Sequence, residues 1–396
     1  MDSVDPAESA PPGWPHFDDD EIEAAMAPLR SGKVNYWTGT QGRSFEEEFA
    51  AAMGARAAVA VANGTVALEV GLEALGVGPG DEVVVTPRTF VATASAVVRV
   101  GATPVFADVD PVTQGITAAT VEPVLSDRTR AVIVVHLGGW PGDVAALRAL
   151  CDQRGIAVME DCAQAHGAAI GGRRVGGLGT IAAWSFCQDK IMTTGGEGGM
   201  ITTNDEALAE SVWALKDHGK SFDAVYRRDH PPGFRWLHEG IGTNARMTES
   251  QSAIGRVQLT KLDRWVDTRR SHAARLDAAF ADVEALRLTI PPADIHHAYY
   301  RHYAFVRPER LAPGWDRDRI IAEVAAKGQA VFSGSCGEVY RERAFVERGL
   351  APAEPMPVAA ELGDTSLAFL VHPTLEARHI DAVAEAVIET VAAATA

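Results

Sequence analysis

Short apolar, β-branched runs alternate with helix-like segments between residues 56 and 203 of this 396-residue chain. The runs that predict strands are residues 57–62, 82–86, 103–108, 131–136, 156–161, 182–187 and 200–203. The helix-like segments between them include residues 66–75, 90–100 and 143–152. Continuous apolar strands that alternate with helices are typical of a mostly parallel sheet covered on both faces. The sequence therefore predicts an α/β fold, in which ligands bind beyond the carboxyl ends of the strands.

A different pattern begins near residue 245. Apolar residues there repeat at the spacing of one helical face: Met247, Ile254, Val257, Leu262 and Trp265. A long helix at this point would lead the chain out of the large domain. The strand-like run 302–306 and the helix-like segments 317–327 and 380–391 then favour a smaller α/β domain. The expected division is a flexible N-terminal tail and lead-in segment over residues 1–30, a large domain over 31–265 and a small C-terminal domain over 266–396.

The formal net charge of −17 argues against nonspecific binding to nucleic acid or to an anionic membrane, so an anionic ligand needs a local positive site. No pair of the four cysteines (Cys151, Cys162, Cys187 and Cys336) has CxxC spacing, and we expect reduced thiols in a cytoplasmic protein. The start, MDSVDPAESAPPGWP, lacks the basic and apolar stretches of a signal peptide, and a flexible tail is expected there. No apolar run approaches the roughly 18 residues of a membrane span.

Lys190 is the first candidate for chemistry, in the stretch SFCQDKIMTTGGEGG. A lysine just beyond an apolar strand can be an ordinary surface residue. To act as a nucleophile it would need its reference pKa of about 10.4 lowered, so that a neutral amine is available for Schiff-base chemistry. The glycines after it either let the backbone approach a bulky ligand or mark a hairpin, and the pattern leaves both interpretations open.

Asp161 ends the strand-like run IAVMED, at the end of a strand where ligands bind in this class of fold. It either caps a following helix or pairs with the pyridinium nitrogen of a cofactor, which would keep the ring protonated as an electron sink. Gln164 follows three residues later. Its side chain either caps the backbone or donates a hydrogen bond to a ring hydroxyl.

The sequence Asn63-Gly64-Thr65 follows a strand-like run and precedes an apolar helix-like segment. Backbone N–H groups and a hydroxyl at such a helix start can bind a phosphate, although many similar turns bind nothing. Ser185 is either a second phosphate ligand or a plain strand serine. Phe90 could stack on a cofactor ring or pack in the core.

In this order the motifs closely resemble the DegT/StrS family of sugar aminotransferases, which have the fold-type I architecture of aspartate aminotransferase. The resemblance runs from about Asn35 to the C-terminus. It is carried by the stretches NGTVALEVGLEALGVGPGDEVVVTPRTFVATASAV, GATPVFADVDPVT, EDCAQAHGA, SFCQDK, GGEGGM and NARMTESQSAIGRVQL.

The resemblance implies a pyridoxal 5'-phosphate (PLP) cofactor and a role for each candidate residue. Lys190 would be the Schiff-base lysine and proton carrier, and Asp161 the partner of the pyridinium nitrogen. The other cofactor contacts would be Gln164 at the ring hydroxyl, Phe90 on the ring face, and Gly64, Thr65 and Ser185 at the phosphate. Asn244 would reach the phosphate of the neighbouring subunit's cofactor, so the active unit would be a homodimer.

The implied reaction moves an amino group from an amino acid, most often L-glutamate, through pyridoxamine phosphate to a nucleotide-linked keto sugar in deoxyaminosugar biosynthesis. Resemblance of residues 218–240 and 296–303 to C4-acting members favours a dTDP- or UDP-linked 4-keto-6-deoxyhexose. The alternatives are a 3-keto sugar or scyllo-inosose. A pyridoxamine-phosphate sugar 3-dehydratase would carry histidine in place of Lys190, and a non-catalytic scaffold would not need the candidate residues together.

Other polar residues have ordinary alternatives. The spacing of His296, His297 and His302 fits the start of a strand better than a zinc site with short ligand pairs, so no metal is expected. Three further residues could contact a phosphate or carboxylate of the substrate, or could be solvated surface charges: Arg88, His218 and Arg246.

Overall fold

The computed structural model describes residues 12–395 and has the predicted α/β fold. Its centre is a seven-stranded sheet in the order β1-β9-β8-β5-β4-β2-β3. These strands are β1 (Ala57–Val61), β2 (Glu82–Val85), β3 (Thr103–Phe106), β4 (Thr129–Val135), β5 (Ala157–Asp161), β8 (Ile181–Ser185) and β9 (Gly199–Thr203). All seven predicted strands are therefore confirmed, and their ends lie within two residues of the prediction.

The sheet is mostly parallel, but β9 runs antiparallel to both of its neighbours, β8 and β1. The chain turns back directly after β8, and the N–H of Phe186 donates a 2.8 Å hydrogen bond to the carbonyl of Gly198 across the turn. Gly195 and Gly196 have φ angles of 84° and 121°, which L side chains rarely adopt. The glycines after Lys190 thus form a hairpin, one of the two interpretations that the sequence left open.

Helices cover both faces of the sheet, as the continuous apolar strands indicated. The three predicted helices are α3 (Gly64–Ala74), α4 (Ala92–Arg99) and α6 (Val144–Cys151), and α7 (Glu206–Lys216) follows β9. Alternate strand residues point to opposite faces, so Val83 lies in the same buried core as Leu68 of α3, while Val84 lies in the core that holds Leu147 of α6. Each of these fully buried side chains stabilises the fold by roughly 1.5–3 kcal/mol.

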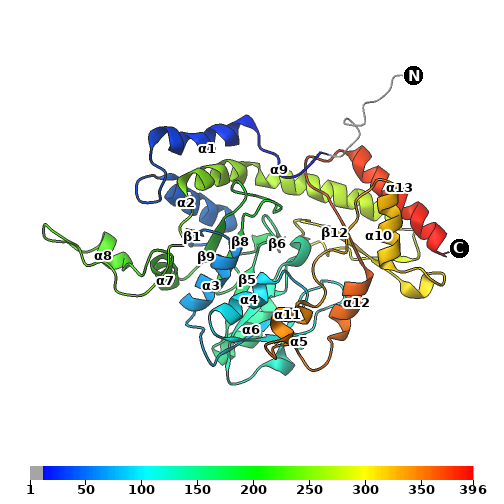
Figure 1. Cartoon of the computed structure of the whole chain (residues 1–396), viewed down its shortest axis with the longest axis horizontal. Coiled ribbons are helices and arrows are strands. Elements are labelled where there is room, and N and C mark those ends of the chain that lie inside the picture. Colours follow the sequence, from blue (N-terminus) through cyan, green and yellow to red (C-terminus); the bar gives the residue numbers. More distant parts are fainter. Residues whose placement is uncertain (1–11, 396) are drawn as a thin grey trace.

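The predicted long helix is α9 (Glu249–Phe280), whose first turn is capped by the side chain of Thr248. Its first half packs in the core of the large domain through Leu262 and Val266. Its second half packs in a separate core, through Leu276 and Phe280, with elements nearer the C-terminus (Figure 1). These include β10 (Leu286–Leu288), α10 (Arg317–Ala326), β12 (His302–Val306), β13 (Ser366–Phe369) and α13 (Ala377–Thr395). The proposed boundary between residues 265 and 266 therefore falls inside α9.

Two helices near the N-terminus were not predicted: α1 (Asp19–Ser31), which lies along α9 (Figure 1), and α2 (Gln41–Met53). Helix α1 begins at a capping box between Asp18 and Glu21 and ends at Gly32, whose φ is 71°. The first eleven residues of the predicted flexible tail lie outside the described residues, whereas residues 12–18 run along the protein before α1.

The remaining elements are short. They are α5 (Ala118–Val121), β6 (Ala169–Ile170), β7 (Arg173–Arg174), α8 (Phe222–Tyr226), β11 (Ile295–His296), α11 (Arg343–Val346) and α12 (Pro357–Thr365). Within residues 12–395, none of the helices combines the length and the apolar character that crossing a membrane requires.

Candidate active site

The turns that follow β1, β2, β5 and β8 meet at one edge of the sheet, because the carboxyl ends of parallel strands lie together. They line a cavity of about 1050 Å³. Seven of the eight predicted site residues line it: Gly64, Thr65, Phe90, Asp161, Gln164, Ser185 and Lys190. The eighth, Asn244, is exposed at the surface and does not line this cavity.

Asp161 is buried at the end of β5 and is held by neutral donors. The hydroxyl of Thr93 donates a 2.8 Å hydrogen bond to its Oδ2, and the N–H of Ala163 donates one of 3.2 Å to its Oδ1. No helix follows within residues 162–168, so Asp161 does not cap a helix. Burial raises the pKa of Asp161, although the charge of nearby Lys190 acts in the opposite direction. A buried carboxylate of this kind suits a cationic N–H partner.

Gln164 is oriented from the loop after β4. The N–H of Gly138 donates a 2.7 Å hydrogen bond to Oε1 of Gln164. With its oxygen occupied, the side-chain amide presents its N–H groups as donors beside Asp161. Gln164 therefore contacts the backbone and can still donate a hydrogen bond to a ligand in the cavity.

The N-terminus of α3 and the end of β8 form a tight corner of the cavity. Asn63 caps α3 with its side-chain oxygen. A Cβ atom added at Gly64 would lie 2.6 Å from Cβ of Ser185, and one added at Gly199 would lie 2.4 Å from the carbonyl oxygen of Asn63, so only glycine fits at these two positions. The helix N-terminus, with the hydroxyls of Thr65 and Ser185 beside it, is suited to a phosphate.

Lys190 reaches the cavity from the hairpin after β8, and its side chain is 15% exposed. Its Nζ lies 3.3 Å from Oδ1 of Asp189 and 5.1 Å from the centre of the Tyr300 ring. The Tyr300 hydroxyl donates a hydrogen bond to Asp189. Burial acts to raise the pKa of Asp189, but the charge of Lys190 and the hydrogen bond from Tyr300 outweigh it and lower this pKa. Asp189 is therefore the counter-ion of Lys190.

Phe90 is 65% exposed in the wall of the cavity, so it is not a core residue. Three residues that shape the site were not predicted from the sequence: Thr93, Asp189 and Tyr300. Thr93 lies three residues after Phe90, in the first turn of α4, and both residues line the cavity, so closeness to Phe90 in the sequence is the signal that could have found it. No comparable local signal marks Tyr300, which comes to Lys190 from the distant segment before β12.

A second buried carboxylate, Glu160, lies directly before Asp161. It accepts hydrogen bonds of 2.7–2.9 Å from three backbone N–H groups, those of Gly176, Leu178 and Gly179. Nε2 of His136 lies 3.1 Å from Glu160, and Nδ1 of His136 accepts a hydrogen bond from the N–H of Gly142. Nε2 is therefore the protonated nitrogen, and Glu160 and His136 satisfy each other as a structural pair.

The three other candidates for substrate contacts do not line the cavity. Arg246 forms an ion pair of 2.7 Å with Asp217. Arg88 is fully buried, and its Nε donates a 2.9 Å hydrogen bond to Gln114. His218 is exposed, with a φ of 61°.

The histidines near β12 have local partners. Nε2 of His302 lies 2.7 Å from Oδ1 of Asp277. Nδ1 of His297 accepts a 2.8 Å hydrogen bond from the N–H of Tyr299, and His296 belongs to β11.

A sequence model of the DegT/DnrJ/EryC1/StrS aminotransferase family matches residues 15–388. The chain belongs to this aminotransferase family. Its cofactor is PLP, and the buried Asp161, the corner at the start of α3 and Lys190 suit the ring nitrogen, the phosphate and the aldehyde of that group. The fold-type I architecture is confirmed.

Relatives of this family member include sugar aminotransferases. It is 34% identical to the UDP-N-acetyl-3-dehydro-alpha-D-glucosamine 3-aminotransferase of Acidithiobacillus ferrooxidans. The match spans 382 residues, which are 93% of this chain and 96% of that protein. It is 36% identical over 371 residues to the dTDP-3-amino-3,4,6-trideoxy-alpha-D-glucose transaminase of Streptomyces venezuelae, covering 92% of each. A solved aminotransferase from Psychrobacter cryohalolentis is 50% identical, with a TM-score of 0.96 over 98% of this chain and 100% of that one.

Proposed function

We propose that this aminotransferase moves an amino group from L-glutamate to the ketone of a nucleotide-linked sugar, in deoxyaminosugar biosynthesis. The observation that carries the proposal is the cavity in which Lys190, the buried Asp161 and the start of α3 meet. The two sugar-specific relatives support the substrate class, because they match this chain over nearly its whole length.

Each residue has a defined part in this proposal. When bound, PLP supplies the electron sink that stabilises negative charge at the reacting carbon. Lys190 holds the cofactor covalently through Nζ and, once released, moves a proton at that same atom. Asp161 keeps the ring nitrogen protonated, and Gln164 donates to the ring hydroxyl. Phe90 lies against the ring face.

The phosphate would be held by the backbone N–H groups of Gly64 and Thr65 and by the hydroxyls of Thr65 and Ser185. This corner supplies positive potential from the helix N-terminus, which a chain of net charge −17 does not supply as a whole. Binding of an anion is therefore a local property of the cavity.

Two positions of the ketone are in question. The names of both relatives place the amino group at C3, which favours a 3-keto sugar for this chain. Resemblance of residues 218–240 and 296–303 to C4-acting members favours a 4-keto-6-deoxyhexose. We propose C3 first and keep C4 as the second candidate, because the relatives match over the whole chain and the two segments cover only part of it.

A panel of dTDP- and UDP-linked 3-keto and 4-keto hexoses, each with L-glutamate, tests the function. The readouts are release of 2-oxoglutarate and the position of the new amine by mass spectrometry and NMR. Lys190→Ala is the control for background transamination. Turnover of scyllo-inosose with none of the nucleotide sugars would contradict the proposal, and amination at C4 alone would reverse the order of the two candidates.

We also propose a homodimer in which Asn244 serves the neighbouring subunit's cofactor. Asn244 pairs with Asp217 in an isolated β-bridge. The segment between these two residues carries α8 and projects from the protein (Figure 1), and three of its apolar side chains are largely exposed: Phe234 (79%), Trp236 (85%) and Ile241 (91%). Exposed apolar groups of this kind mark interaction surfaces, and two-fold dimers are the commonest assembly. A cytoplasmic location remains part of the proposal, supported by four unpaired cysteines.

A further inference from the structure

Residues 12–18, here called the N-terminal strap, pass close to the hairpin that carries Lys190. The indole Nε1 of Trp14 donates a 2.8 Å hydrogen bond to the backbone carbonyl of Lys190, across 176 residues of sequence. The backbone N–H of Lys190 is already bonded to the carbonyl of Cys187. Trp14 therefore completes the main-chain hydrogen bonding of the lysine on the side away from its own hairpin.

Packing holds the Trp14 ring so that its N–H points at this carbonyl. The ring meets Trp265 of α9 edge to face, with centroids 5.1 Å apart. It stacks on His372, beyond β13, with centroids 6.2 Å apart. The strap thus contacts both the long helix and the small C-terminal domain at the point where it holds Lys190.

A buried cation gives the same ring a second role. Arg269 of α9 is fully buried, and its guanidinium lies 5.3 Å from the centre of the Trp14 ring. Its Nε and Nη2 have no hydrogen-bond partner within residues 12–395, and burial lowers its pKa to about 9. An aromatic face stabilises such a desolvated cation. The position of Trp14 is therefore stabilised by more than its hydrogen bond.

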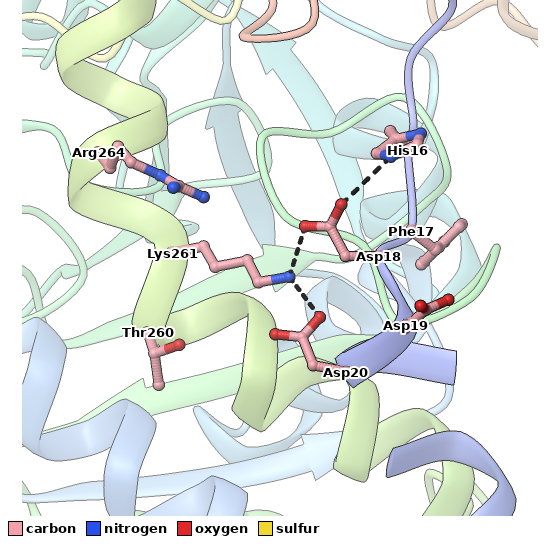
Figure 2. Close-up of a pocket in the computed structure, with 8 residues that line it drawn as sticks. All are labelled: His16, Phe17, Asp18, Asp19, Asp20, Thr260, Lys261 and Arg264. Carbon is pink, nitrogen blue, oxygen red and sulfur yellow. Dashed lines mark hydrogen bonds and ion pairs between the residues drawn. The ribbon is translucent and has the colours of Figure 1, made fainter. Parts of the chain in front are cut away.

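The far end of the strap is fixed to α9 by charge. Figure 2 shows Lys261 of α9 reaching Asp18 and Asp20, at 2.9 Å and 2.7 Å. Glu21, at 2.9 Å, is a third carboxylate partner. The side chains of Lys261 and Glu21 are only 10% and 1% exposed, so the pair between them is better shielded from water than an ordinary surface pair, whereas Asp18 and Asp20 are more than half exposed.

We propose that Trp14 is a positioning residue for Lys190. Its N–H fixes the carbonyl, and hence the main chain from which the lysine side chain reaches the cofactor. Ile191 and Met192, directly after Lys190, are anchored in the core of the large domain, whereas Gln188 is exposed and Asp189 and Lys190 are only half-buried, so the core restrains the main chain at and before Lys190 less. Small displacements of a reacting group cost much of its reactivity, so an external restraint matters here. The inference rests on the proposed role of Lys190 as the residue that holds the cofactor.

The test compares Trp14→Phe with Trp265→Phe. Trp14→Phe keeps an aromatic ring against Arg269 but loses the N–H, whereas Trp265→Phe removes the same indole N–H from the same cluster without touching Lys190. Hydrogen exchange of the cofactor-free protein is measured over residues 186–194. We expect Trp14→Phe to speed exchange there at least threefold and Trp265→Phe to leave it unchanged.

In the loaded enzyme, Trp14→Phe should also speed PLP release about threefold or more and shift the pH midpoint of the bound-cofactor absorbance. Equal behaviour of the two variants in all three measurements would overturn the proposal. Should Trp14→Phe fail to fold, Lys261→Met loosens the strap without changing Trp14, and unchanged exchange over 186–194 in that variant would overturn it too. Hydrogen exchange needs no cofactor, so its outcome is separate from failure of Lys190 to bind PLP.

Discussion

The hydroxyl of Thr93, in the first turn of α4, donates a 2.8 Å hydrogen bond to Oδ2 of Asp161, at the end of β5. The bond links the helix that follows β2 to a strand two places away in the sheet. It orients the carboxylate without neutralising it. Asp161 therefore faces the cavity as a carboxylate whose charge a cation could neutralise.

Asp161→Asn should fold and still bind PLP but lose at least about 100-fold in turnover, because an amide cannot keep the ring nitrogen protonated. Steady-state kinetics and cofactor absorbance measure both effects. Thr93→Val is the matched control and should lose less, since the carboxylate remains. Near-normal turnover of Asp161→Asn would remove Asp161 from this role.

The same substitution has an expected effect on stability. Burial raises the pKa of Asp161 above its usual 3.8. The contribution of this carboxyl group to the free energy of unfolding is therefore complete below pH 3.8 and is lost as the pH rises. At pH 7 the cofactor-free Asp161→Asn protein should therefore be at least as stable to urea as the wild type. A large loss of stability would mean that the charged form is favoured in the fold.

Lys190→Ala should abolish the covalent link and the proton transfer together, lowering transamination by several orders of magnitude. The wild type should absorb at roughly 400–430 nm, and borohydride should remove that band by reducing the imine. Peptide mapping after reduction should find a phosphopyridoxyl group on Lys190. The variant should still bind pyridoxamine phosphate through Asp161, Thr65 and Ser185. An adduct on another lysine would contradict the assignment.

Composite active sites predict complementation between two inactive variants. In a hybrid of Lys190→Ala and Asn244→Ala subunits, one of the two sites has both native residues. Random mixing gives hybrids in half of the dimers, so about a quarter of wild-type activity should return. Each variant mixed with itself is the control. A fully active monomer in sedimentation would exclude the shared site.

His166 should make the protein sensitive to acid. It is buried between Trp184 and Phe186, and burial, together with the charges of Lys190 and Arg269, lowers its pKa from 6.5 to about 3. The His166 ring is protonated at a higher pH in the unfolded chain than in the folded protein. The free energy of unfolding should therefore fall as the pH drops from 6.5 towards 3. Replacing His166 with Leu should reduce this slope by about 1.4 kcal/mol per pH unit in urea unfolding. Parallel curves for both proteins would contradict the prediction.

The sequence predicted the sheet well because a buried parallel strand leaves a continuous apolar run, as in β4. It predicted the cavity residues because they follow such strands directly. Helix α1 was not predicted, because its apolar residues are only partly buried: Ile22 is 48% exposed and Leu29 is 65% exposed. Its stability depends on contacts with α9, which no local pattern encodes.

Long-range contacts explain the other differences. Trp14 stands in a proline-rich stretch that predicted a flexible tail, and its partner Lys190 lies 176 residues away. The glycines after Lys190 fit two interpretations until the antiparallel pairing of β8 with β9 identified a hairpin. Asp189 and Tyr300 form their hydrogen bond across two segments that the sequence does not connect.

Glu160 and Asp161 are consecutive in β5, so their side chains leave the strand on opposite faces. Glu160 is bound by backbone N–H groups of the 176–179 turn and by His136. A slip of one residue would bring Glu160 to the cavity in place of Asp161 and Met159 to the backbone amides in place of Glu160. The 176–179 turn therefore helps to fix the register of β5, so mutations in this turn can change which carboxylate faces the cofactor.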